Sequence, residues 1–419
     1  MGYTISKTTI SQILFTICAG VPYINNYELT FFVWILTMLL TLQLKYSLSF
    51  LKLLLPYVFI IVIAFVSFFF YKNQTYDVIR DITYLLKPVF GLLIGYQLCK
   101  SVHIKTINTI IYAGLFIALI HLGIIFYNAI IHKILSVNKL REYGGYFSDF
   151  EIYSIILLIF SKEFQLNFSK TRIWLFIIII GFSSFLYLSR TNFIQLALFY
   201  LTLKGYFNWN KRALIILSTF ILSTIIGYTI IYNMNFTRQG KGLEAFFYKV
   251  KNAPIEAFKT KINQDDYEDF NDNYRSFENI KTVKQVTLEG WDAILFGKGL
   301  GATVDIGREV YTNDGTVIRY EAILHNAYMT VFLKSGLLGV FFLIYFMYLL
   351  MKHKKSDIPM VNQINLLLLA TGIFLIFENW VLLGIFLKTE SKAVLIGFII
   401  YYKEFIIMEN KQVDEIENK

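Results

Sequence analysis

The chain has 419 residues, of which 56% are hydrophobic and only 16% carry a charge. Soluble globular domains contain about 45–50% apolar residues, so this composition excludes an ordinary soluble protein. The net charge of +10 would suggest nucleic-acid binding in a soluble protein, but in an apolar chain it is typical of basic cytoplasmic loops. We therefore expect a membrane protein that has no nucleic-acid partner.

Long apolar runs along the chain predict its elements. A helix needs about 20 residues to cross a hydrocarbon core, and within lipid its backbone amides must be bonded internally. The first run lacks a small-residue cleavage pattern, so we expect a membrane helix there rather than a signal peptide. These runs predict an all-α, polytopic membrane protein with about twelve crossings. They cover residues 10–23, 29–44, 53–70, 82–98, 107–130, 150–160, 173–188, 191–203, 213–232, 328–351, 364–386 and 393–402.

One long polar segment, residues 233–324, divides the predicted helices into two groups. Residues 1–232 are expected to form an N-terminal bundle of about nine helices, and residues 325–408 a C-terminal group of about three. Within the segment, residues 242–252 and 277–288 are compatible with helices. Loops longer than about 15 residues usually carry function or are disordered, so we expect a functional role for this one. The polar tail, residues 409–419, is expected to be disordered.

Charge predicts the orientation. Basic residues concentrate in alternate short connections, which the positive-inside rule assigns to the cytoplasm. Both termini are then cytoplasmic, and residues 233–324 are extracytoplasmic. A single helix over residues 173–203 would be roughly 46 Å long, and basic loops flank both of its ends. We therefore expect two helices that turn at the outer face, around Ser189, Arg190 and Thr191.

His325-Asn326 is followed after nine residues by Gly336-Leu337-Leu338-Gly339. If one helix carried this block, both glycines would lie within about 40° of the His325 direction and would allow a neighbouring helix or a lipid tail to approach closely. We expect His325 at the helix N-terminus, where the dipole attracts phosphate and favours a neutral imidazole that could act as a general base. The alternative is an interfacial histidine that only caps the helix.

Two arginines are candidates for anion binding. Arg190 is costly in lipid and therefore marks a site or an interior pair. It could clamp a pyrophosphate through paired hydrogen bonds, or it could extend to the headgroups. Arg275 begins a loop stretch that reaches Trp291 and a glycine-rich run, residues 295–301, which contains Lys298. That run could form an anion-binding nest or an ordinary turn, and Arg275 could equally be a solvated charge.

Four other charged residues are further candidates for substrate binding. Lys87, inside a predicted helix, could meet a lipid phosphate or a partner residue, and Arg80 at the mouth of that helix could simply neutralise Asp81. Arg141 lies in another outer loop. Glu378, an acid within a predicted membrane helix, marks a site by default or is a partnered structural carboxylate. The histidines and the two cysteines show no metal-ligand spacing, so we predict no metal and no cofactor.

Taken together, these residues resemble the O-antigen polymerase and O-antigen ligase superfamily of bacterial envelope enzymes. The resemblance covers the chain in topology but only a small part of it in motif. In that family the loop arginine usually stands closer to the tryptophan than Arg275 does to Trp291. The matching features are about twelve crossings, a large outer loop after the ninth, the Ser189-Arg190-Thr191 turn, the His325-Asn326 and Gly336-Leu337-Leu338-Gly339 block, and the run from Trp291 to Gly301.

The resemblance implies a GT-C-like fold and a metal-independent, inverting glycosyltransferase of the bacterial inner membrane, with its active site facing the periplasm. The donor would be an oligosaccharide linked to undecaprenyl pyrophosphate. Arg190 and Arg275 would neutralise the pyrophosphate, His325 would orient or deprotonate the attacking hydroxyl, and Asn326 would belong to the substrate site. The favoured activity is polymerisation of O-antigen or capsular repeat units, with a chain-length regulator and membrane lipid as further partners.

Two other functions stay open. An O-antigen ligase would transfer the glycan to the lipid A-core instead of to another lipid-linked repeat unit. A lipid-linked oligosaccharide flippase or another transporter would need polar residues that line a cavity at the membrane midplane, whereas most charges here are expected near the outer surface.

Overall fold

The computed structural model describes residues 7–101, 107–134, 136–207, 211–238, 243–256, 259–311, 317–352 and 354–417, and most of these residues are helical. The elements in chain order are α1 (Lys7–Gly20), η1 (Val21–Ile24), α2 (Tyr27–Leu40), α3 (Leu48–Phe68), α4 (Thr75–Ser101), α5 (Asn108–Ile130), α6 (Val137–Gly144), α7 (Asp149–Ile159), α8 (Lys170–Leu186), α9 (Arg190–Leu203), α10 (Lys211–Asn233), α11 (Glu244–Glu256), α12 (Tyr267–Asp272), α13 (Tyr274–Leu288), α14 (Trp291–Phe296), β1 (Val304–Tyr311), β2 (Val317–Glu321), α15 (Ala327–Met351), α16 (Pro359–Val381), η2 (Gly384–Phe386) and α17 (Lys392–Glu417).

Five of the helices are long and apolar enough to cross a membrane. They cover Leu48–Phe68, Thr75–Lys100, Asn108–Ile130, Ala327–Met351 and Pro359–Val381, and two shorter apolar stretches precede them. The chain is therefore a multi-pass, mainly α-helical membrane protein, as its composition predicts. Each of the twelve predicted runs overlaps a helix, whereas the number of crossings stays a prediction.

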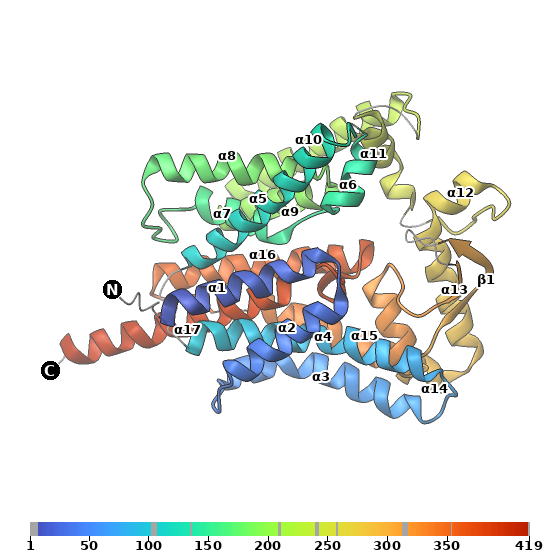
Figure 1. The fold of residues 1–419 in the computed structure, drawn as a ribbon, viewed down its shortest axis with the longest axis horizontal. Coiled ribbons are helices and arrows are strands. Elements are labelled where there is room, and N and C mark those ends of the chain that lie inside the picture. The colour runs from blue at the N-terminus through green and yellow to red at the C-terminus, as the bar shows by residue number, and fades with distance from the viewer. Residues whose placement is uncertain are drawn as a thin grey trace.

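Figure 1 shows the apolar helices gathered into an elongated bundle, with the start of α1 and the end of α17 at the same end of it. Elements from the long polar segment, α11 to α14 and β1, gather at the opposite end. The side of the membrane on which each end lies stays a prediction. The predicted helices at residues 242–252 and 277–288 correspond to α11 and α13.

Helices α4 and α17 approach each other closely because small residues line their interface. Gly91 and Gly95 stand four residues apart on α4, a spacing that allows two backbones to come together in a membrane. A Cβ atom at Gly95 would overlap the Val394 carbonyl oxygen, and one at Gly397 would overlap the Leu92 carbonyl oxygen. The contact joins the first helices of the chain to the last one.

The turn of residues 297–301 fastens the polar segment to the bundle. α15 is broken at Gly336 (φ 64°, ψ −162°), where a Cβ atom would overlap the backbone of Leu295. The turn's amide donors all have protein acceptors: Lys298 N–H bonds to Leu333 O (2.8 Å), Gly299 N–H to Lys334 O (3.1 Å), Leu300 N–H to Ala64 O (3.0 Å) and Gly301 N–H to Asp81 Oδ2 (2.6 Å). These groups are not available to an anion, so the run acts as a structural latch instead of a nest.

Two details differ from the expectations. β1 and β2 form an antiparallel hairpin within the polar segment, so that the fold is not entirely helical. The tail does not begin at residue 409, because α17 continues through Glu417. Residues 403–417 contain no glycine or proline and include four glutamates, which favours a continued helix. The predicted break between residues 173 and 203 is confirmed, since α8 ends at Leu186 and α9 begins at Arg190.

Replacing Gly95 by alanine should destabilise the bundle, because the added methyl group would have to displace the backbone of α17. Overpacking of this kind costs about 1–3 kcal/mol. Thermal unfolding of the detergent-solubilised protein measures the effect. Gly123→Ala on α5 is the matched control, since a Cβ atom there meets nothing within 4 Å; an equal loss in both variants would contradict this packing.

Candidate functional site

His325 lies just before α15 and not within it. Asn326 is the N-cap of that helix, and its side chain accepts a hydrogen bond from the Met329 N–H at 3.2 Å. The expected alignment of His325 with Gly336 and Gly339 along one helix is therefore wrong, since the helix starts after the histidine and is broken at Gly336. The expected position of His325 at the N-terminal end of the helix is confirmed.

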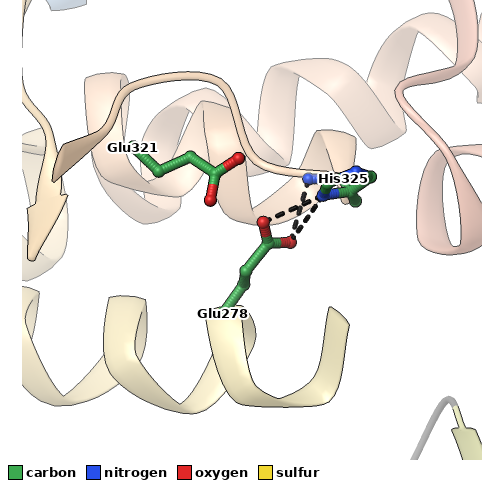
Figure 2. A group of neighbouring side chains, drawn as sticks. All are labelled: Glu278, Glu321 and His325. Atoms are coloured by element: carbon green, nitrogen blue, oxygen red, sulfur yellow. Dashed lines mark hydrogen bonds and ion pairs between the residues drawn. The ribbon is translucent and has the colours of Figure 1, made fainter. Parts of the chain in front are cut away.

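A buried carboxylate fixes the imidazole. Glu278, on α13, has a fully buried side chain, and its two oxygens lie 2.9 and 3.1 Å from His325 Nδ1. The same carboxylate accepts the backbone N–H of His325 at 3.2 Å. Figure 2 shows these contacts between the helix and the loop. Because a carboxylate accepts hydrogen bonds, Nδ1 is the donor in this contact, and Nε2 is the ring nitrogen that remains for a ligand. The His325 side chain is 49% exposed, so Nε2 can reach a ligand.

A second carboxyl group faces the first. Glu321 ends β2, and Figure 2 shows its carboxyl group directed toward that of Glu278. The Tyr274 hydroxyl donates to Glu321 Oε2 at 2.7 Å. Burial and the nearby Glu278 carboxylate raise the pKa of Glu321 to about 9. Glu321 is therefore protonated at neutral pH.

Four basic side chains act on one another through their charges, with Glu256 as the acid among them. We call Arg141, Arg190, Lys249 and Arg275 the cation group. Arg190 of α9 and Arg275 of α13 both contact Glu256, at 3.5 and 3.0 Å. Arg190 also donates to the Lys249 carbonyl oxygen at 2.5 Å. Burial and the positive charges of Arg141 and Arg190 lower the pKa of Lys249, while Glu256 opposes this effect. Four cations against one carboxylate leave a net charge of +3 when all are ionised, which suits a ligand with several negative charges.

Helix α13 carries residues of both groups. Arg275 and Glu278 are three positions apart and therefore lie on one face of the helix, about 5–6 Å from Cβ to Cβ. Arg275 belongs to the cation group, and Glu278 holds His325. The three residues predicted to be catalytic, His325, Arg190 and Arg275, are thus brought to the same end of the bundle.

An apolar groove begins beside the histidine. Its volume is about 650 Å³, and it lies between α13, α15 and α16. Tyr328 and Met329, in the first turn of α15, stand only a few residues after His325. The groove therefore runs along α15 and α16, two of the helices long and apolar enough to cross a membrane. Its lining residues are Val283, Tyr328, Met329, Phe332, Leu337, Val340, Ile376 and Trp380.

Three of the residues expected to bind substrate have protein partners instead. Lys87 is fully buried and donates to the carbonyl oxygens of Leu387, Lys388 and Glu390, so it does not reach a lipid headgroup. Lys298 pairs with Glu289 at 2.7 Å. Glu378 is buried and pairs with Lys392, which agrees with the structural alternative. In the described structure none of these three residues contacts His325.

The other three candidates lie near the site. Arg80 pairs with Asp77 at 2.5 Å, and its charge acts on Glu321. Arg80 forms no ion pair with Asp81, whose partner is the buried Lys334 at 2.5 Å. Arg141 belongs to the cation group. Asn326 caps α15, and its Nδ2 atom is buried with no hydrogen-bond partner among the described residues.

Sequence reasoning missed three members of the site, Glu278, Glu321 and Lys249. Glu278 follows Arg275 by three residues on a predicted helix, a signal that could have placed the two side chains together. Nothing in the sequence pairs it with His325, which is 47 residues away. No family model and no curated protein matches this chain, so the site rests on its own geometry.

The raised pKa of Glu321 predicts a pH-dependent stability. The folded protein binds this proton more tightly than the unfolded chain, whose glutamate has a pKa near 4.3, so this contribution to the free energy of unfolding falls as pH rises from about 4.3 to about 9. Glu321→Gln removes the contribution. The melting temperature of the variant should therefore increase relative to wild type as pH rises across that range. A difference that is constant with pH would contradict a protonated Glu321.

Proposed function

We propose that this protein is a polymerase of bacterial surface polysaccharide, of the O-antigen or capsular kind. It transfers a growing glycan from undecaprenyl pyrophosphate to a lipid-linked repeat unit on the periplasmic side of the inner membrane. One observation carries the proposal: Arg275 and Glu278 lie on one face of α13. Arg275 belongs to the cation group, and Glu278 holds His325. The family resemblance of the sequence motifs supports the same reaction class.

The proposed reaction uses the two halves of the site for different tasks. Nε2 of His325 takes the proton of the acceptor hydroxyl, and the oxygen attacks the anomeric carbon of the donor sugar. The bond between that carbon and the phosphate oxygen breaks on the opposite face, and its electron pair leaves with the pyrophosphate. Arg190 and Arg275 stabilise the negative charge that develops there. The configuration at the anomeric carbon is inverted.

Each part of this mechanism has a physical requirement that the site meets. A general base must be correctly oriented, and the contact between Glu278 and Nδ1 fixes the ring direction of His325 and leaves Nε2 for the substrate. Arginine suits a diphosphate because its guanidinium group can form two parallel hydrogen bonds. The apolar groove next to His325 suits the isoprenoid part of a polyprenyl substrate. No step requires a metal ion or a cofactor.

Ligation to the lipid A-core would use the same chemistry with another acceptor, and a deletion strain distinguishes the two. Loss of a polymerase leaves lipopolysaccharide with a single repeat unit, whereas loss of a ligase leaves a bare core and accumulated lipid-linked chains. A chain-length regulator is an expected partner of the polymerase. A strain that retains long surface glycans without this protein would exclude both activities.

Substitution of the imidazole or its carboxylate partner should nearly abolish chain growth in a complemented deletion strain. General-base catalysis contributes about 10²–10⁴-fold, so we expect losses of that order for His325→Gln and a smaller loss for Glu278→Gln, which keeps the shape of the side chain. Gel profiles of the surface polysaccharide, normalised to protein level, measure the effect. His132→Gln, at an exposed histidine, is the control, and an unchanged profile in His325→Gln would exclude the base role.

Polymer formation should depend on the paired hydrogen bonds of the arginines as well as on their positive charge. Arg190→Ala and Arg275→Ala are expected to reduce polymer formation strongly, and Arg190→Lys should restore only part of it, because an ammonium group cannot form paired hydrogen bonds. Purified variants with a labelled lipid-linked repeat unit give the rates. Arg172→Ala, at an exposed position near the start of α8, should behave as wild type. Full activity of Arg190→Ala would contradict pyrophosphate binding at this position.

A further inference from the structure

A second group of titratable residues lies inside the bundle, apart from His325. Asp149 begins α7, Glu378 lies on α16, and Glu390 lies between η2 and α17. Carboxylate oxygens of all three come within 4.8 Å of one another, and none of the three residues is more than 3% exposed. The buried Lys392 contacts Glu378 and lies 2.9 Å from Asp149 Oδ2. We call these four residues the acid cluster.

The acid cluster lacks one positive charge. Besides Lys392, the other cation that faces it is Lys87 of α4, which donates to three carbonyl oxygens of the chain around Glu390. Three carboxylates against two ammonium groups leave a net charge of −1. An uncompensated buried charge is costly, and a buried acid normally takes up a proton instead.

Two carboxylate oxygens without a hydrogen-bond partner in the described part of the chain mark the place where an additional positive charge would bind. Asp149 Oδ1 and Glu378 Oε1 are buried with no hydrogen-bond partner among the described residues. Both residues are completely buried. Carboxylates that share such a space cannot all ionise. The ammonium group of Lys392 already contacts two of the three acids, in the position that a metal ion would take. A proton is therefore the positive charge that best compensates the remaining net charge of −1.

The other groups around the acid cluster do not supply the charge. Tyr23 of η1 faces Asp149, Glu151 and Glu390, and its hydroxyl lies 3.0 Å from Ser148 Oγ. Tyr153 of α7 hydrogen-bonds to Thr371 at 2.5 Å. These phenols are neutral, and Glu151 is a further acid.

A row of buried polar groups continues from Glu151. Its Oε1 atom accepts hydrogen bonds from Ser183 (3.1 Å) and Tyr187 (3.3 Å). Ser183 Oγ lies 2.8 Å from Nδ1 of the buried His121. Hydroxyl, carboxyl and imidazole groups in such a row can pass a proton between them.

We propose that Asp149, Glu378 and Glu390 form a proton-binding site in which one exchangeable proton is shared around Lys392. Release of that proton to water leaves all three groups as carboxylates and adds one negative charge between α4, α7, α16 and α17. The bound proton therefore holds these four helices together. The proposal does not depend on the glycosyl-transfer activity, because no member of the acid cluster contacts His325 or the cation group in the described structure.

Infrared spectroscopy of the purified full chain tests the proposal, because a protonated carboxyl group has its own carbonyl band. Because the carboxyl group of Glu321 gives a band in the same pH range, the measurement uses Glu321→Gln as its parent protein. That protein should show the band at about pH 6 and lose it toward about pH 9, where a carboxyl of raised pKa gives up its proton. The band should be reduced in Glu390→Gln or in Asp149→Asn, whose amides imitate the protonated acid. Glu163→Gln, at an exposed position, should keep it. A band unchanged in Glu390→Gln, Asp149→Asn and Glu378→Gln overturns the proposal.

Thermal unfolding gives the second readout. A group with a raised pKa in the folded state loses its stabilising effect as pH rises, so the melting temperature of Glu390→Gln should increase relative to wild type between about pH 6 and about pH 9. The comparison is repeated in sodium chloride and in choline chloride. If sodium, and not pH, raises the melting temperature of wild type while leaving Glu390→Gln unaffected, the site binds a metal cation and the proton proposal is wrong.

Discussion

The hydrogen bonds between the buried Glu278 carboxylate and His325 are the interaction on which the site depends. They come from two segments that are far apart in the chain, a helix of the polar segment and the loop before α15. One carboxylate fixes the backbone N–H and the ring Nδ1 together, so that the ring has one orientation and one tautomer. Without Glu278, His325 would be a half-exposed side chain at a helix end. With it, the ring direction is fixed and Nε2 is the nitrogen that remains for a ligand.

The remainder of the fold keeps that contact in place. The latch at residues 297–301 binds the polar segment to α3 and α15 through backbone hydrogen bonds and to the Asp81 side chain of α4 through the Gly301 N–H. The buried pair of Lys334 and Asp81 strengthens this junction. Glycines at the interface of α4 and α17 bring the first and last parts of the chain together. Removal of one partner of a buried ion pair leaves an uncompensated charge, which makes such junctions specific for one arrangement.

The apolar runs and the charge pattern of the sequence predict much of the fold, but few of the contacts between residues of the site. The apolar runs predict the helices because lipid leaves no other backbone structure, and the basic loops around residues 173–203 predict the turn at Arg190. The sequence also singles out His325, Arg190 and Arg275. It does not show that Lys87 and Glu378 contact other protein groups inside the bundle. Buried polar contacts and ligand sites are built from the same residue types, so the sequence does not distinguish them. Glu278 and Glu321 escape prediction because their roles arise only when β2, α13 and the loop before α15 meet.

Reconstitution of the purified protein with a labelled, undecaprenyl-pyrophosphate-linked repeat unit, in the presence of a metal chelator, tests the central claim most directly. The proposed function requires glycans of increasing length on the lipid carrier together with release of undecaprenyl pyrophosphate, and both products should require His325 and Glu278. Movement of the labelled lipid across the bilayer without any chain growth would contradict it and would identify a transporter.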